Sequence, residues 1–209
     1  MVNNNAPNSD DNLSTKSSVE NLTGCKSEIT CMSTDPPFTE SENNNPMFLL
    51  KKIKMSNANR LVIAHLNINS LRNKFVDLQL LIKDKVDVLL VTETKLDVSF
   101  PTSQFIIEGY STPFRIDRDG YGGGVILYTR EDLPCREFKI NCDINALEGI
   151  FLELNLRKTK WLIFGGYNFN KCNIEKYLLT LGKILDNYMS KYEHFLLIGD
   201  LTLKLQNII

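Results

Sequence analysis

The sequence lacks the features that mark secreted, membrane-spanning and zinc-binding chains. Its beginning shows no basic stretch followed by an apolar segment, and no apolar run is long enough to span a bilayer. The five cysteines are an odd number, widely spread and without a CxxC spacing. This pattern favours reduced thiols over a disulfide framework or a structural zinc site. We therefore expect an intracellular protein with no membrane partner, and the nucleus is a compatible compartment.

Histidine is also scarce, which limits the choice of a general base. The chain has two histidines, His65 and His194, and both stand within or just before an apolar run. Histidines in such positions are more often packed or edge residues than catalytic bases. We therefore expect both His65 and His194 to be packed or edge residues.

Aromatic residues are nearly absent from residues 1–46, which hold nine Asn and seven Ser but a single aromatic, Phe38. Such a segment cannot bury enough apolar surface to offset its ordering entropy. We expect 1–56 to be a disordered, acidic tail and linker, and 57–209 to be the folded domain. Residues 47–209 hold 22 basic and 18 acidic residues, a net +4. That charge suits a polyanion partner and is equally ordinary for a soluble domain.

Three lysines, Lys51, Lys52 and Lys54, lie just before the first predicted strand. One interpretation is a contact with nucleic acid or with the nuclear import machinery. The other is a run of solvated charges in a linker, which we favour.

The apolar periodicities predict a mixed, largely antiparallel α/β layered fold. Asn69 and Ser70 have good N-cap chemistry for the first helix, and Asn173 for the second. Helices are expected near 71–84 and directly after Asn173. Strands are expected at 61–67, 86–93, 105–107, 125–129, 147–155, 160–167 and 195–199.

Three of the apolar runs end in a polar residue that can hold a metal or a phosphate: Asn67, Glu93 and Asp200. Ligands gather where buried strands end, so these side chains are expected at one edge of a sheet. Carboxylate and amide oxygens suit Mg²⁺, which keeps several of its own waters. The pattern therefore indicates metal-assisted phosphoester chemistry.

Several blocks of residues, taken in order, resemble a known domain. They are His-Leu-Asn-Ile-Asn-Ser-Leu-Arg-Asn-Lys-Phe at 65–75, Glu-Thr-Lys-Leu-Asp at 93–97, Arg-Ile-Asp-Arg at 115–118 and Gly-Gly-Gly-Val at 122–125. Together they resemble the apurinic/apyrimidinic-like endonuclease domain of non-LTR (LINE-type) retrotransposons. That domain belongs to the endonuclease/exonuclease/phosphatase (EEP) superfamily. The resemblance covers roughly residues 57–202.

The resemblance implies a four-layered α/β sandwich of the EEP type, with the active site at one edge of the paired sheets. It also implies nicking of DNA with Mg²⁺ (or Mn²⁺) as cofactor, leaving a 3′-hydroxyl. In a full-length element a reverse transcriptase segment would use that end as a primer, and we expect no such segment in this chain.

The resemblance also implies roles for five residues. Glu93 would be the main metal ligand, and Asn67 would bind a metal-coordinated water or a phosphate oxygen. Tyr167 would contact the phosphate, and Asp200 would orient or deprotonate the attacking water. Thr202 stands where the family has an asparagine that holds the phosphate. The purely structural alternatives are a surface carboxylate for Glu93, a capping or turn amide for Asn67 and an ordinary strand-end aromatic for Tyr167.

Arg115 and Arg118 flank Asp117 ahead of the glycines. They could bind phosphates of a DNA backbone, or Arg115 and Arg118 could pair with Asp117 and fix the loop; both interpretations stay open. The glycines do not form a GxGxxG motif and lead into a predicted strand, so we reject a dinucleotide site and expect a tight turn instead.

The family has a second catalytic aspartate and a Ser-Asp-His motif in the last third of the domain, and this sequence has neither. We therefore expect a domain truncated at its C-terminal end. A catalytically inactive remnant and a nucleic-acid-binding module of the same fold remain alternatives to an active endonuclease. A phosphatase or lipid phosphodiesterase with this fold is a further one.

Overall fold

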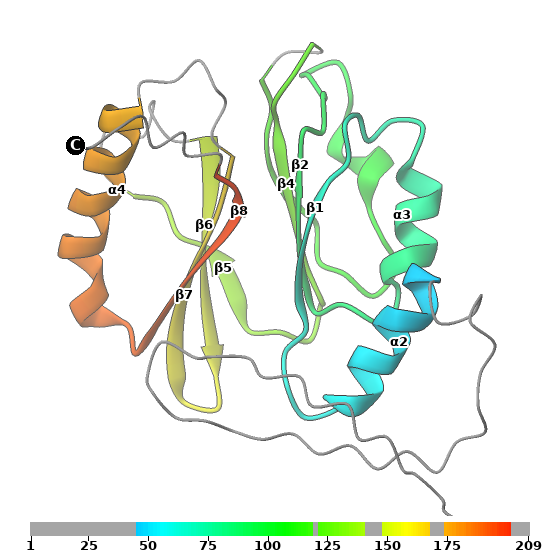
Figure 1. Ribbon diagram of the computed structural model, residues 1–209, viewed down its shortest axis with the longest axis horizontal. Helices are drawn as coiled ribbons and strands as arrows, with labels where there is room; N and C mark the ends of the chain where they lie inside the picture. The colour runs from blue at the N-terminus through cyan, green and yellow to red at the C-terminus, as the bar shows by residue number, and fades with distance from the viewer. Residues whose placement is uncertain (1–44, 119–120, 141–147, 168–173, 202–209) are drawn as a thin grey trace, which may run out of the picture. The chain divides into compact units, whose positions relative to one another are not determined.

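Two four-stranded sheets form the centre of the computed structural model, which describes residues 45–118, 121–140, 148–167 and 174–201 (Figure 1). In spatial order, the first sheet consists of β1 (Ile63–Asn67), β2 (Val88–Thr92), β4 (Val125–Thr129) and β3 (Phe114–Ile116). The second consists of β5 (Cys135–Glu137), β6 (Glu148–Leu156), β7 (Thr159–Tyr167) and β8 (His194–Asp200).

Each sheet contains one parallel pair of strands, and a helix joins the two strands of that pair. Helix α3 (Phe75–Ile82) lies between β1 and β2 in the chain, and α4 (Ile174–Tyr188) lies between β7 and β8. The remaining pairs are antiparallel. A parallel pair needs such a crossover, whereas antiparallel strands can be joined by short turns. The predicted mixed α/β fold is confirmed.

The layers follow from the alternation of side chains along the strands. Inward-facing residues such as Leu90, Leu127, Leu152 and Ile163 are buried in one apolar core between the two sheets. The outer face of the first sheet packs against α3, and that of the second packs against α4. The described part thus has a helix–sheet–sheet–helix order, as expected for a four-layered sandwich (Figure 1).

Short elements are where the structure differs from the prediction. The expected strand at 105–107 is wrong, because a short 3-10 helix, Thr102–Phe105, occupies its start. Phe105 and Ile107 are apolar because they are buried against the core beneath α3, without being in a strand. The three-residue strands β3 and β5 were not predicted.

The predicted cap of the first helix is also wrong. Helix α3 begins at Phe75 with Lys74 as its N-cap. Asn69 and Ser70 instead adopt positive φ values of 47° and 87°, and the amide of Ser70 donates to the carbonyl of Glu93. These residues therefore join the ends of β1 and β2. Asn173 lies outside the described residues, so its capping role stays a prediction.

Helix α2 (Pro46–Ser56) lies in the segment predicted to be linker, and for these residues the prediction is wrong. Its first turn contains a proline, and the side chain of Asn45 accepts a hydrogen bond from the amide of Met47 at 2.9 Å. Both features are typical of a helix start. The residues before Asn45 lie outside the described ranges, and the disordered tail stays a prediction.

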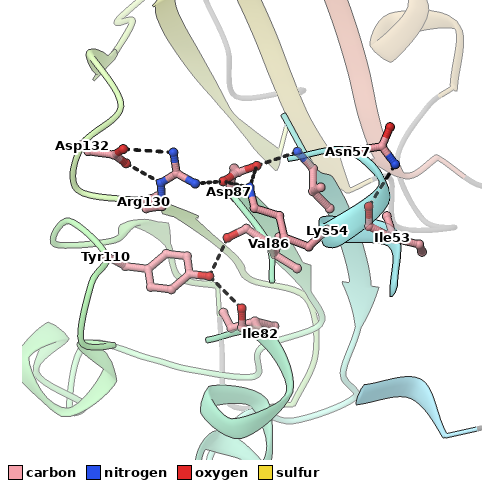
Figure 2. Close-up of polar contacts among 10 residues, drawn as sticks. Ile53, Lys54, Asn57, Ile82, Val86, Asp87, Tyr110, Arg130 and Asp132 are labelled. Atoms are coloured by element: carbon pink, nitrogen blue, oxygen red, sulfur yellow. Dashed lines mark hydrogen bonds and ion pairs between the residues drawn. The ribbon is translucent and has the colours of Figure 1, made fainter. Parts of the chain in front are cut away.

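A buried carboxylate explains why α2 is part of the domain (Figure 2). Asp87 is 1% exposed, and Lys54 of α2 donates to both of its oxygens at 2.7 Å. Arg130 also donates to it, as does the amide of Val62. Lys54 therefore is not a solvated linker charge, because it neutralises an acid that would otherwise be costly to bury.

Within the described ranges, no helix combines the length and the apolar character that crossing a bilayer requires.

Candidate functional site at the edge of the two sheets

Four strands, two from each sheet, end at one edge of the sandwich. In the first sheet β1 ends at Asn67, opposite Thr92 at the end of β2, and Glu93 follows directly. In the second sheet β7 ends at Tyr167, which lies opposite Asp200 at the end of β8. Parallel pairing within each sheet places both strand ends at the same level. The structure thus brings Asn67, Glu93, Tyr167 and Asp200 together.

The side chain of Asn67 connects the carboxylates of the two sheets. Its Nδ2 donates to Glu93 Oε1 and to Asp200 Oδ2, at 3.0 Å each. The two acceptor oxygens are therefore at most 6.0 Å apart. Its Oδ1 accepts a hydrogen bond from the amide of Asn69 at 3.2 Å, which fixes the orientation of the amide group. A neutral donor between two carboxylates reduces their repulsion and keeps both at the solvent-accessible edge.

Tyr167 supports the same carboxylate from the second sheet. Its hydroxyl donates to Glu93 Oε1 at 3.1 Å, while its ring is buried in the core between the sheets. Burial, followed by the charge of Glu93, raises the pKa of Tyr167 to about 12. The phenol is therefore protonated at neutral pH and can act only as a donor to an anion.

The backbone that carries Glu93 is strained. Four non-glycine residues around the site have positive φ: Asn69, Ser70, Glu93 and Lys95. Each such conformation costs on the order of 1 kcal/mol or more and persists only where surrounding bonds enforce it. Here the amide of Ser70 donates to the carbonyl of Glu93 at 2.8 Å, and that of Leu71 to the carbonyl of Thr94 at 3.0 Å. Strain of this kind concentrates at functional sites.

The two histidines lie in the kinds of position expected for them: His65 is partly packed, and His194 is exposed on the edge strand β8. His65 is half-buried beneath Asn67 on β1, and its Nε2 lies 3.0 Å from Thr92 Oγ1. Burial lowers the pKa of His65, although the charge of Asp200 opposes the shift. His194 begins β8, at the opposite end of that strand from Asp200, with its ring 4.2 Å from that of Trp161.

Comparisons with known proteins identify the fold. No protein-family model matches the chain, and no curated protein matches its sequence. Among solved structures, the 3′-5′ exonuclease NExo from Neisseria meningitidis is similar with a TM-score of 0.51 and 19% identity, over 66% of this chain and 56% of that one. The 3′ phosphatase NExo from Neisseria, bound to a product DNA hairpin, gives 0.51 and 18%, over 67% and 57%. The chain has the EEP fold.

This chain spans somewhat more than half the length of those two proteins. The endonuclease domain of TRAS1, a telomere-specific non-LTR retrotransposon, is also similar, with 14% identity over 68% of this chain and 58% of that one. Its TM-score of 0.47 is too low to carry an argument.

Within the EEP fold, the two arginines named from the sequence have different environments. Arg115 is almost fully bonded inside the protein: it donates to both oxygens of Asp117 and to the carbonyls of Phe100 and Asp97. It therefore fixes the loop before β4, which is one of its two predicted roles. Arg118 is exposed, and its Nη1 lies 3.5 Å from Glu148 Oε2. Thr202 lies outside the described residues.

Glu148, the first residue of β6, is a residue of this edge that the sequence did not predict. In the antiparallel pair β6–β7 it lies opposite Tyr167, so the start of β6 is at the same edge as the end of β7. The predicted site residues Asn67, Glu93 and Asp200 stand at the ends of apolar runs, whereas Glu148 stands before one. Glu148 directly precedes such a run, Gly149–Leu152, and this is the signal that could have found it.

The residues at this edge fit a divalent cation. Glu93 and Asp200 supply carboxylate oxygens, and the exposure of Asn67 leaves room for water ligands, which Mg²⁺ retains. Within the described ranges no cluster of three or more His, Cys, Asp and Glu residues occurs. A cation here would be held by the carboxylate of Glu93, the amide of Asn67 and water, with the second carboxylate, Asp200, at the same edge.

Proposed function

We propose that this protein is a Mg²⁺-dependent hydrolase of DNA phosphodiester bonds. It nicks DNA and leaves a 3′-hydroxyl, as retrotransposon endonucleases do. The observation that carries the proposal is the pair of hydrogen bonds from Asn67 Nδ2 to Glu93 and Asp200, because it unites the strand-end carboxylates of both sheets in one site. The similarity to NExo, described as an exonuclease and as a phosphatase bound to a DNA hairpin, supports DNA as the substrate.

Glu93 and Asn67 would hold the metal ion. A bound Mg²⁺ supplies positive charge that stabilises the charge developing on the phosphate. Asp200 orients the attacking water and accepts its proton, since its carboxylate oxygen already lies at the same edge. When DNA binds, Tyr167 would turn its single phenolic hydrogen from Glu93 Oε1 to a phosphate oxygen; its raised pKa keeps that hydrogen in place at neutral pH. Thr202 would add a hydroxyl to the same phosphate, and Arg118 would bind a neighbouring one.

The biological setting belongs to the same proposal. A 3′-hydroxyl nick serves as a primer, so the expected partner beyond DNA is a reverse transcriptase segment of the same element. DNA as substrate makes the nucleus the expected location.

A plasmid assay tests the proposal. We expect the full chain to convert supercoiled plasmid to the nicked circle with Mg²⁺ and not with EDTA, and Glu93→Ala to lower the rate at least 100-fold. A DNA polymerase should extend the nick, which reports a free 3′-hydroxyl. Salt-sensitive DNA binding without nicking, unchanged in Glu93→Ala, would instead indicate a binding module.

A further inference from the structure

Glu148 lies in the candidate site, but the proposed mechanism gives it no role. It is in register with Tyr167 on β7, which in turn lies opposite Asp200 on β8, so the three residues form a row across the second sheet. Its side chain is 17% exposed, which is low for a carboxylate at a sheet edge. A partly buried acid needs donors, and two of those of Glu148 come from the segment between β3 and β4 of the first sheet.

One of these donors belongs to the glycine turn before β4, and the other is Arg118, a few residues earlier. The amide of Gly124 donates to Glu148 Oε1, and Arg118 Nη1 lies 3.5 Å from Oε2. Gly123 and Gly124 have φ values of +71° and +83°, which L side chains rarely adopt. A Cβ atom on Gly123 would lie 2.8 Å from Glu148 Oε1 and 2.6 Å from Arg118 Cδ. The turn is therefore closed directly around this carboxylate.

The same turn holds the segment that follows Glu93. The carbonyl of Gly124 accepts from the amide of Thr94 at 3.2 Å, and the carbonyl of Gly123 accepts from the amide of Lys95 at 3.0 Å. On its other side the segment is held by Ser70, whose amide donates to the carbonyl of Glu93. The left-handed conformation of Glu93, with φ 55°, is thus enforced from two directions.

We propose that Glu148 is a positioning residue for Glu93 and acts through the glycine turn. Its carboxylate fixes Gly124, the carbonyls of Gly123 and Gly124 fix Thr94 and Lys95, and these hold Glu93 at the edge of the sheets. The role of Glu93 as a metal ligand rests on the proposed function. The hydrogen bonds that link Glu148 to residues 93–95 do not depend on the proposed function, and their effect can be measured separately.

Amide hydrogen exchange on the full chain tests the inference without requiring catalysis. In Glu148→Ala we expect the amides of Thr94 and Lys95 to exchange about tenfold faster or more than in the wild type, because the turn that accepts from them is released. Glu148→Gln should stay within about threefold of the wild type, since its amide oxygen still accepts from Gly124.

Glu153→Ala is the matched control. Glu153 is a buried carboxylate of the same strand, bonded to Arg136 and to the hydroxyl of Tyr192 instead of the glycine turn. We expect it to leave the exchange of Thr94 and Lys95 unchanged. If Glu148→Ala does not fold, Glu148→Asp replaces it, because the shorter side chain draws the carboxylate away from Gly124.

Exchange of Thr94 and Lys95 that is unchanged in the folded Glu148 variant, or equally fast in Glu153→Ala, would overturn the inference. Where the wild type nicks plasmid, Glu148→Ala should lower kcat about tenfold or more while KM for DNA stays within about twofold, and Glu148→Gln should restore most of the rate. A wild type that does not nick would refute the proposed function, and the exchange result would still decide the role of Glu148.

Discussion

The Nδ2 group of Asn67 lies between two carboxylates that come from different sheets. An asparagine here can donate to both acids, whereas an aspartate could donate to neither once ionised. The neutral amide therefore permits two acids to approach each other in the absence of a cation. With a cation bound, Asn67 could instead turn its Oδ1 toward the metal ion or one of its waters.

The substitution Asn67→Asp tests whether the amide of Asn67 offsets the repulsion between Glu93 and Asp200. A third carboxylate at this edge should lower the free energy of unfolding at pH 7 by about 1–2 kcal/mol, because like charges then lack a donor between them. Mg²⁺ should restore most of that loss and should raise Tm more than it does in the wild type. Thermal unfolding with and without Mg²⁺ measures both effects.

Asn155→Asp is the control for this substitution. Asn155 is an exposed asparagine near the opposite end of β6, so its variant should show little change in either condition. Equal responses of the two variants to Mg²⁺ would argue against a cation site at Asn67.

Tyr167 gives a prediction about pH. Its pKa is about 12 in the folded protein, against an ordinary value of 10.0 for the unfolded chain. Its contribution to stability is fully present below pH 10 and is lost as pH rises toward 12, because the unfolded state ionises first. Between pH 8.5 and 10.5 the wild type should lose about 1 kcal/mol more stability than Tyr167→Phe. Urea unfolding of both proteins at the two pH values measures the difference, and parallel curves would contradict the assignment.

At this scale the sequence predicted part of the site. Asn67, Glu93 and Asp200 each end an apolar run, and that local pattern is enough to name them. Glu148 was not predicted because its place at the edge depends on the antiparallel pairing of β6 with β7, which the local sequence does not reveal. The structural role of Arg115 was one of two alternatives, and only the three-dimensional contacts with Phe100 and Asp97 favour it.

At the scale of elements, strands that contain a long apolar run were predicted correctly, whereas the shortest elements were not. The six runs that form β1, β2, β4, β6, β7 and β8 are recognisable because most of their residues are buried or half-buried. Strands β3 and β5 have three residues each, too few for a periodicity to show. Helix α2 was missed because its links to the domain are long-range: Lys54 is bonded to a buried acid 33 residues away, and Leu50 packs against the core beside α3.

Lys54→Ala should show how much α2 depends on that bond. Removing the ammonium group leaves Asp87 buried with fewer donors, so we expect a loss of about 2–3 kcal/mol in the free energy of unfolding. Lys52→Ala, an exposed lysine of the same helix, should change it by less than about 0.5 kcal/mol. Chemical unfolding of both variants measures the contrast, and equal losses would mean that Lys54 does not anchor the helix.

At the scale of the whole described part, the site exists because two sheets pack face to face. Each sheet contributes one acid through the end of a parallel strand pair, Glu93 beside β2 and Asp200 on β8. The blocks at 65–75, 93–97, 115–118 and 122–125 suggested this fold from the sequence, since their order and spacing are specific. The pairing of the acids through Asn67 could not be predicted, because it depends on contacts between residues 133 positions apart.

The most direct test of this account is a comparison of single-turnover plasmid nicking in Glu93→Gln, Asp200→Asn and the double variant of the full chain with Mg²⁺. Acids that act in one site should be non-additive: each single variant should lose at least about 100-fold, and the double variant little more. Independent, multiplicative losses, or a single variant that nicks at the wild-type rate, would contradict the claim that the two sheets form one catalytic site.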